Sequence, residues 1–287
     1  MKEAVFYNPL DDKSVKCGLC PHCCIIPPDK KGLCGVRHNQ NGRLIAGSYG
    51  RVTSIALDPI EKKPLYHFYP GAKILSLGSY GCNFHCGFCQ NYEISMGQAA
   101  FRELSPEDVT VASAELAPKG NIGVAYTYNE PFIGYEFVED CAHLIAEQGQ
   151  KNVIVTNGFM RKEPLERLLP FIHAMNIDLK SFRPEFYREI GGRLEDVQRT
   201  IAFAAPRCHL EVTILIIPGK NDSPEEMRSL SGWLASINRD IPLHVSRFFP
   251  AHKLRDIPAT PVETVCRLVE VARQSLRYVY PGKYTHF

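Results

Sequence analysis

Three cysteines lie close together in the run Cys82-Asn83-Phe84-His85-Cys86-Gly87-Phe88-Cys89. Thiolates at this C-x3-C-x2-C spacing can bind three irons of a [4Fe–4S] cluster. No fourth cysteine follows nearby, so one iron would keep an open position for a small ligand. A zinc knuckle with a distant fourth ligand is the alternative, although zinc usually takes four ligands in paired spacings.

A second group of cysteines, Cys17, Cys20, Cys24 and Cys34, lies near the N-terminus. Four soft ligands suit a closed tetrahedral zinc site, which would stabilise a segment too small for a core of its own. A second iron–sulfur cluster uses the same number of ligands. Cys23 could replace Cys24 or stay free. We therefore expect a second site that holds zinc or an auxiliary cluster.

The composition limits the classes of function. The chain has 287 residues and eleven cysteines, and its N-terminus lacks the apolar region of a signal peptide. This cysteine usage predicts a reducing, cytoplasmic location and metal chemistry in place of disulfides. A net charge of +2 without a basic–aromatic patch argues against a nucleic-acid partner, and no apolar run is long enough to span a membrane.

From Lys73 onward, apolar runs typical of buried parallel strands alternate with helical segments. Ser105 and Ser223 each precede a proline and acidic residues, which is a helix-start signal. We expect strands at residues 73–77, 122–127, 152–156, 175–179, 210–217 and 243–248.

Six β-then-α units predict an α/β fold that forms a partial (β/α)6 TIM-like barrel. A doubly wound open sheet is the rival topology. We expect the barrel over residues 72–287, preceded by a cysteine-rich, β-containing module with its connector over residues 1–71.

Unusual polar residues recur at the expected carboxyl ends of the strands, where parallel α/β folds place their chemistry. Asp178 and Lys180 are two apart, so on a strand they share one face, and an ion pair is their simplest explanation. Asn157-Gly158 and Pro218-Gly219 are turn signals when taken singly. Their recurrence at successive strand ends, after the cysteine run, predicts a binding site.

The cysteine run resembles the signature of the radical S-adenosylmethionine (SAM) enzymes. Glu130-Pro131 stands where these enzymes carry an element that meets the amino group of SAM. The segments 156–158, 178–180 and 217–222 resemble those that line SAM in the glycyl-radical-enzyme activases, such as the pyruvate formate-lyase activases. The resemblance implies that SAM is bound by Phe88, Asn129, Glu130, Thr156, Asn157, Asp178, Lys180, Ile217 and His244.

Three of these residues carry specific expectations. The resemblance implies that the backbone of Ile217 approaches the adenine and that His244 lies near the adenosyl group. Asn129 replaces the second glycine of the family's Gly-Gly-Glu-Pro pattern, so its side chain could add a hydrogen bond or alter the contact with the amino group.

A resemblance over nearly the whole chain is to the radical SAM component of the AmmeMemoRadiSam system. It rests on the segments 17–25, 32–37, 58–65, 81–95, 126–131 and 244–250. This resemblance implies Memo-like and AMMECR-like protein partners, together with a small electron donor of the flavodoxin or ferredoxin type.

The implied activity is reductive cleavage of SAM, bound to a [4Fe–4S] cluster, into methionine and a 5′-deoxyadenosyl radical that abstracts hydrogen from a substrate. The sequence identifies neither that substrate nor a further catalytic side chain. Two alternatives stay open: an activase of a glycyl radical enzyme, and a non-catalytic iron–sulfur sensor or scaffold.

Overall fold

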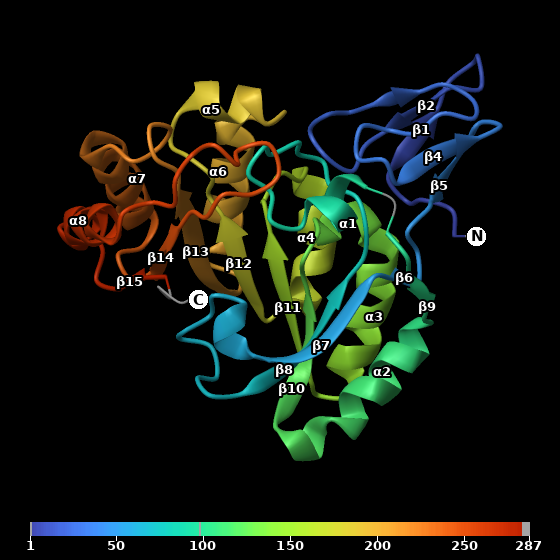
Figure 1. The fold of residues 1–287 in the computed structure, drawn as a ribbon. Coiled ribbons are helices and arrows are strands. Elements are labelled where there is room, and N and C mark those ends of the chain that lie inside the picture. Colours follow the sequence, from blue (N-terminus) through green and yellow to red (C-terminus); the bar gives the residue numbers. More distant parts are fainter. Residues whose placement is uncertain (1, 98, 283–287) are drawn as a thin grey trace.

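The largest element of the fold is an eight-stranded sheet in the order β15-β14-β13-β12-β11-β10-β8-β7 (Figure 1). The computed structural model describes residues 2–97 and 99–282. Neighbouring strands are parallel, except that β7 runs antiparallel to β8 at one edge. The strands are β7 Ser54–Pro59, β8 Lys73–Gly78, β10 Asn121–Tyr126, β11 Lys151–Thr156, β12 Ala174–Asp178, β13 His209–Ile216, β14 Leu243–Arg247 and β15 Val279–Pro281.

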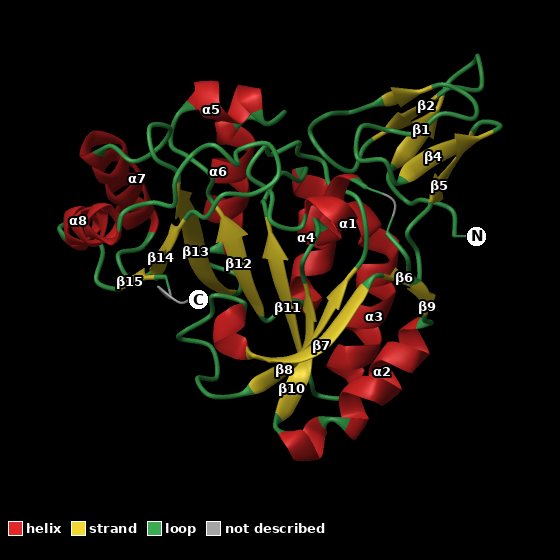
Figure 2. Cartoon of the chain, viewed as in Figure 1, coloured by secondary structure: helices red, strands yellow, loops and turns green. Residues whose placement is uncertain are grey.

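Helices follow the parallel strands and pack on one face of the sheet (Figure 2). The helix starts expected at Ser105 and Ser223 are confirmed, because each hydroxyl accepts a hydrogen bond from a first-turn backbone N–H. The helices are α1 Tyr92–Met96, α2 Pro106–Glu115, α3 Tyr135–Glu147, α4 Lys162–Leu168, α5 Pro184–Glu189, α6 Leu194–Ala204, α7 Pro224–Ile237 and α8 Val262–Arg273. Short 3-10 turns are η1 Ile60–Lys62, η2 Ala117–Lys119, η3 Pro131–Gly134 and η4 Leu169–Phe171.

The strand order confirms the expected partial barrel. Strands β8 and β10–β15 follow one another across the sheet in sequence order, without the reversal that defines a doubly wound sheet. The six expected strands are present, with ends that differ by at most one residue. The sequence did not predict β15, or that β7 would join this sheet.

The N-terminal part of the chain forms small antiparallel sheets beside the barrel (Figure 1). A buried ion pair fastens it to α3: Arg37 Nη2 lies 2.7 Å from Glu136 Oε1, and both side chains are at most 2% exposed. Breaking such a pair would leave a buried charge without its partner. The strands are β1 Tyr7–Pro9, β2 Val15–Cys17, β3 Ile25–Ile26, β4 Arg37–Gln40, β5 Arg43–Ala46, and β6 Arg51–Val52 with its partner β9 Arg102–Glu103.

Residues 60–71, here called the floor segment, close the amino-terminal end of the barrel strands. Its side chains Ile60, Leu65 and Phe68 pack against inward-facing residues of β8, β10, β11 and β12 in a hydrophobic cluster separate from the main core. The sequence grouped this segment and β7 with the N-terminal module, but in the structure both pack with the barrel.

A buried carboxylate holds the floor segment in place. Glu211 on β13 is fully buried and accepts hydrogen bonds from the backbone N–H groups of Tyr66 and His67 at 3.0 and 2.8 Å. It also contacts the ring nitrogens of His209 and His244 at 2.9 and 2.6 Å. The lumen of the barrel is therefore closed on the side opposite the carboxyl ends of the strands.

None of the helices within residues 2–97 and 99–282 combines the length and the apolar character needed to cross a bilayer.

Candidate functional site

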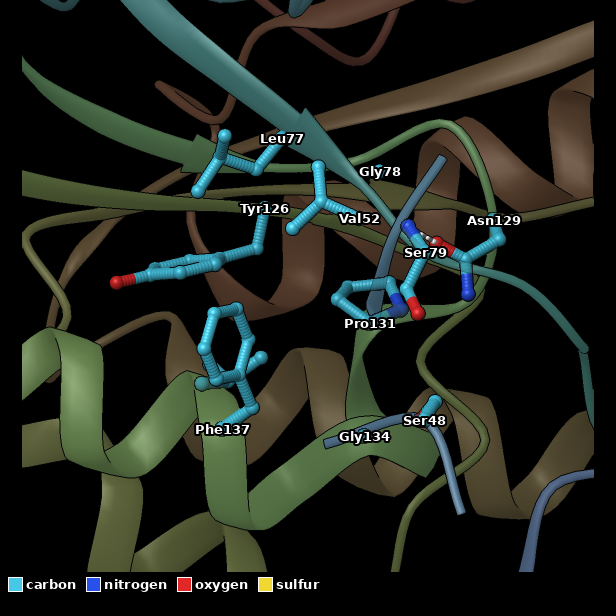
Figure 3. A pocket seen from close by; sticks show the side chains of 11 residues that line it. Ser48, Val52, Leu77, Gly78, Ser79, Tyr126, Asn129, Pro131, Gly134 and Phe137 are labelled. Atoms are coloured by element: carbon cyan, nitrogen blue, oxygen red, sulfur yellow. Dashed lines mark hydrogen bonds between the residues drawn. The ribbon is translucent and has the colours of Figure 1, made fainter. Parts of the chain in front are cut away.

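A cleft of about 570 Å³ opens at the carboxyl ends of the barrel strands and extends into the lumen. The three clustered cysteines line it together with most of the residues expected to bind SAM. The predicted residues that the cleft brings together are Cys82, Cys86, Cys89, Phe88, Asn129, Glu130, Thr156, Asn157, Asp178 and Lys180. A smaller cavity of about 30 Å³ lies behind the rim and is too small for a cofactor (Figure 3).

The cysteine loop follows β8, and its three thiols are free. The backbone N–H of Phe84 donates to Cys82 Sγ at 3.4 Å, and that of Cys89 donates to the carbonyl of Cys86 at 3.1 Å. Burial raises the pKa of Cys82 well above its usual value and that of Cys86 to about 12, so a bound cation is needed to keep these buried sulfurs as thiolates.

The thiols fit a cluster better than a single ion. Among the described residues, no three His, Cys, Asp or Glu side chains converge closely enough to hold one metal ion. In a [4Fe–4S] cluster each thiolate binds a different iron, so the three sulfurs need not meet at one point. The Cys82–Cys86–Cys89 loop is therefore suited to three corners of such a cluster.

Asn83, inside the cysteine loop, fixes the loop to the neighbouring strand end. Its side chain donates to the carbonyl of Phe159 at 2.9 Å and accepts from Asn157 Nδ2 at 2.8 Å. Asn157 Nδ2 also lies 3.7 Å from Cys82 Sγ. The sequence analysis gave Asn83 no role, although its place between two predicted ligands was a usable signal.

Glu130 is the most buried carboxylate in the cleft, at 3% exposure. Its Oε1 accepts hydrogen bonds from Thr156 Oγ1 at 2.7 Å and the Phe132 N–H at 3.0 Å, and its Oε2 accepts one from the Asn157 N–H at 2.8 Å. Burial raises the pKa of Glu130 to about 7, although these hydrogen bonds act in the opposite direction. A carboxylate can accept about four such bonds, so Oε2 keeps room for one further donor.

Asn129 joins the strand ends on either side of the cysteine loop. Its Oδ1 accepts from the Ser79 N–H at 2.9 Å, and its Nδ2 donates to the carbonyls of Tyr80 and Gly81 at 3.2 and 3.1 Å (Figure 3). A glycine at this position would lack all three bonds. The side chain that departs from the family pattern therefore supports the start of the cysteine loop.

Asp178 and Lys180 form the ion pair expected from their spacing, with Lys180 Nζ 2.6 Å from Asp178 Oδ2. Burial opposes the charged form of Lys180, but the Asp178 carboxylate outweighs it and holds the lysine's pKa above its usual value. The positive charge of Lys180 also favours the thiolate of Cys86. The pair thus lies close enough to the cysteine loop to act on it electrostatically.

Two residues expected at the SAM site are not among those that line the cleft. Ile217 is fully buried, and its backbone N–H is bonded to Asn221 Oδ1 at 2.7 Å, so it does not line the cleft. His244 is 2% exposed and lies deeper in the lumen, against Glu211 and the ring of Tyr66. At the end of the same strand, Arg247 lines the cleft instead.

The cleft also contains residues to which the sequence analysis gave no role. Tyr128 has a left-handed backbone with φ of 72°, and its hydroxyl donates to Asp58 Oδ2 at 2.7 Å. Lys62 and Lys63 pair with the same carboxylate, each at 3.0 Å. Two adjacent lysines three and four residues beyond Pro59 gave no signal by themselves, because they reach their partner Asp58 only once β7 and η1 have folded.

The N-terminal cysteines lie near one another and beside the cysteine loop. The N–H of Cys17 donates to the carbonyl of Cys24 at 2.9 Å, and burial raises the pKa of Cys17, of Cys24 and, to about 12, of Cys20. The charges of Cys17, Cys24 and Cys34 add to the shift at Cys20, so the four thiols are close enough to interact electrostatically. Like the loop cysteines, they do not converge on one metal-ion position in the described part of the chain.

Two contacts join this cysteine group to the cleft. His22 Nε2 lies 2.8 Å from the carbonyl oxygen of Asn83, and the His22 ring packs edge-on against Phe159. Gly81 has a φ of +85° and lies close to Cys34. A Cβ added to Gly81 would lie 2.7 Å from the carbonyl oxygen of Cys34. The backbone of the N-terminal group therefore touches the loop that carries Cys82.

Comparison with known proteins agrees with this geometry. Residues 77–230 match the family model of the radical SAM superfamily. An uncharacterized protein of Methanocaldococcus jannaschii is 43% identical over 98% of this chain and 85% of its own length. The pyruvate formate-lyase-activating enzyme of Clostridium pasteurianum is 24% identical over 68% of this chain and 88% of its own length.

Solved structures show the same fold at low sequence identity. Streptococcus suis SuiB bound to S-adenosylmethionine superposes with a TM-score of 0.55 and 17% identity, over 73% of this chain and 52% of that one. A TYW1 structure with a lysine-pyruvate adduct bound gives a TM-score of 0.53 and 15% identity, over 77% of this chain and 83% of that one.

Proposed function

Because this chain belongs to the radical SAM superfamily and is a radical SAM enzyme, we propose that its cleft holds SAM against a [4Fe–4S] cluster bound by Cys82, Cys86 and Cys89. Proteins of this superfamily use that cluster and SAM, and generally take electrons from a flavodoxin or ferredoxin. When bound, the reduced cluster supplies the electron that cleaves SAM into methionine and a 5′-deoxyadenosyl radical, which abstracts hydrogen from a substrate.

The observation that carries the proposal is the meeting of four chemical groups in one cleft: the cysteine loop, Phe88, Glu130 and the Asp178–Lys180 pair. The free acceptor position of Glu130 suits the amino group of SAM. Asp178 and Lys180 offer a carboxylate for ribose hydroxyls and a cation for the SAM carboxylate. Thr156 and Asn157 orient Glu130 through the hydrogen bonds described above.

The test is anaerobic cluster reconstitution, reduction with dithionite and measurement of 5′-deoxyadenosine formed from SAM. Cys86→Ala should abolish the product, whereas Cys208→Ala, a cysteine outside both groups, should leave it unchanged. Absence of product from the wild-type protein, or undiminished product from Cys86→Ala, would reject the proposal.

We infer that the reaction involves partner proteins of the Memo-like and AMMECR-like families, an inference that rests on the sequence resemblance. Incubating the reconstituted enzyme with purified partners should increase the consumption of SAM. Rates that are the same with and without the partners would contradict this inference.

Similarity to a pyruvate formate-lyase-activating enzyme supports a second candidate, activation of a glycyl radical enzyme. That activity predicts a glycyl doublet in the EPR spectrum of a candidate target enzyme after incubation with this protein, SAM and reductant. A target that gains no doublet, although 5′-deoxyadenosine is formed, would exclude activation of that enzyme.

For the second cysteine group, we propose that Cys17, Cys20, Cys24 and Cys34 bind zinc or an auxiliary iron–sulfur cluster. Metal analysis of anaerobically purified protein separates these two readings. About four irons and one zinc per chain supports zinc, whereas about eight irons without zinc supports a second cluster. Cys20→Ala should remove the zinc or about half of the iron.

A further inference from the structure

Three basic side chains, Lys62, Lys63 and Arg247, line the cleft in addition to Lys180. At the floor, Lys62 and Lys63 share one carboxylate, Asp58, which also accepts the hydroxyl of Tyr128. Lys63 is only 3% exposed and lies 4.6 Å from the centre of the Tyr128 ring. Glu61 in the same segment and the buried Glu211 also carry negative charge, so the floor itself has no excess of positive charge.

Arg247, the last residue of β14, places a positive charge at the rim of the cleft. Its Nε donates to the carbonyl of Thr260 at 2.6 Å, and its guanidinium lies 4.9 Å from the centre of the Phe249 ring. Among the described residues it forms no ion pair, and its two terminal nitrogens have no hydrogen-bond acceptor. The guanidinium is thus held at its Nε edge while its terminal N–H groups are available to a ligand.

The other charged groups of the cleft gather near the cysteines. Asp178 and Lys180 neutralise each other, and both influence the charge of Cys86. The negative charge of Glu130 raises the pKa of Cys82. None of these groups pairs with Arg247, so within the described residues its charge has no counter-charge in the cleft. A cationic group in this position attracts an anion.

We propose that the substrate carries an acidic group, a carboxylate or a phosphate, that Arg247 binds this group in the cleft, and that Lys62 contributes a smaller part of the attraction. This proposal rests on the proposed function, because the substrate must share the cleft with SAM. The guanidinium matches either group through two parallel hydrogen bonds. Arg247 is then a residue that determines the substrate class.

The experiment measures the binding of small probes to the reconstituted protein by calorimetry. Malonate and inorganic phosphate represent the two kinds of acid, and malonamide is the neutral counterpart of malonate. The wild-type protein should bind at least one of the acids and not malonamide. The preferred acid then distinguishes a carboxylate substrate from a phosphate substrate.

The variant Arg247→Gln should weaken acid binding by about 10- to 100-fold, because it removes charge-assisted hydrogen bonds. Arg247→Lys should recover part of the affinity through its charge alone. Lys62, which is 64% exposed, should contribute less, so Lys62→Gln should weaken binding only about two- to threefold. The matched control is Arg207→Gln, because Arg207 also lies over a phenylalanine ring but is exposed after the end of α6 and does not line the cleft.

Three results would overturn the proposal: equal affinity for malonate and malonamide, no acid binding by the wild type, or unchanged acid binding by Arg247→Gln and Lys62→Gln. Loss of SAM affinity in Arg247→Gln would also overturn it, because the arginine would then serve the cofactor. A wild-type protein that binds the acids but does not cleave SAM would instead reject the proposed function, so the two failures are distinguishable.

Discussion

Replacing Glu211 by glutamine tests how strongly the floor segment is held. The carboxylate is fully buried and receives hydrogen bonds from Tyr66, His67, His209 and His244. Glutamine keeps the shape but has only one oxygen, so its amide N–H groups would face other donors. Burial acts to raise the pKa of Glu211, but these four contacts outweigh it and lower the pKa from 4.5 to about 2.

The magnitude follows from this pKa. A carboxyl group that titrates at 4.5 in the unfolded chain and at about 2 in the folded chain contributes about 3 kcal/mol of stability at neutral pH. Because the folded-state pKa is the lower one, this stability is complete above pH 4.5 and is lost as the pH falls towards 2. The free energy of unfolding of Glu211→Gln should therefore be about 3 kcal/mol below wild type at pH 7 and about 1.4 kcal/mol below it at pH 3.

Urea unfolding at both pH values measures this difference. Glu270→Gln is the control, because that carboxylate is 69% exposed and its pair with Arg273 lies at the surface; its effect should stay below about 0.5 kcal/mol. A loss smaller than about 1 kcal/mol for Glu211→Gln at pH 7, or a loss that does not shrink at pH 3, would refute the reasoning.

Because the pKa of Glu130 is about 7, the SAM affinity of the wild-type protein, measured by calorimetry, should be about tenfold weaker at pH 6 than at pH 8. The affinity of Glu130→Gln should not change with pH in this way, and equal wild-type affinities at the two pH values would contradict the prediction. Gly123→Ala should lower the free energy of unfolding by about 3 kcal/mol or more, because its Cβ would lie 1.9 Å from a backbone oxygen of β11. Gly232→Ala in α7, with open space around it, should be neutral or stabilising by up to about 1 kcal/mol, and thermal unfolding compares the two. Glu136→Gln should cost about 3–5 kcal/mol, because it leaves Arg37 buried without a counter-charge, and limited proteolysis should then cut the N-terminal module first; resistance equal to wild type would speak against this.

Local patterns were sufficient to predict the barrel. Most of its strands are largely buried, so six of them appear in the sequence as mainly apolar runs, and serine caps mark two helix starts. The order of the strands made it possible to place Asp178, Lys180 and Glu130 at one rim, because parallel strands present their carboxyl ends on the same side.

Contacts between residues far apart in the sequence were not predictable. The resemblance placed His244 near the adenosyl group, but it did not indicate that Glu211 on the neighbouring strand β13 contacts His244, three residues before the end of β14. The floor segment depends on the same carboxylate, which lies 145 residues beyond Tyr66 in the chain. A single sequence contains no local sign of such pairings.

The closed floor has a consequence for the order in which molecules bind. Residues 60–71 pack beneath β8 and β10–β12, and the cleft that reaches Lys63 opens at the rim where the cysteine loop lies. A molecule that must reach Lys63 has to pass that rim before SAM fills it. For such a substrate, prior saturation with SAM should slow association, so rapid-mixing kinetics should show a preferred sequence of addition, with the deeper ligand bound first and released last.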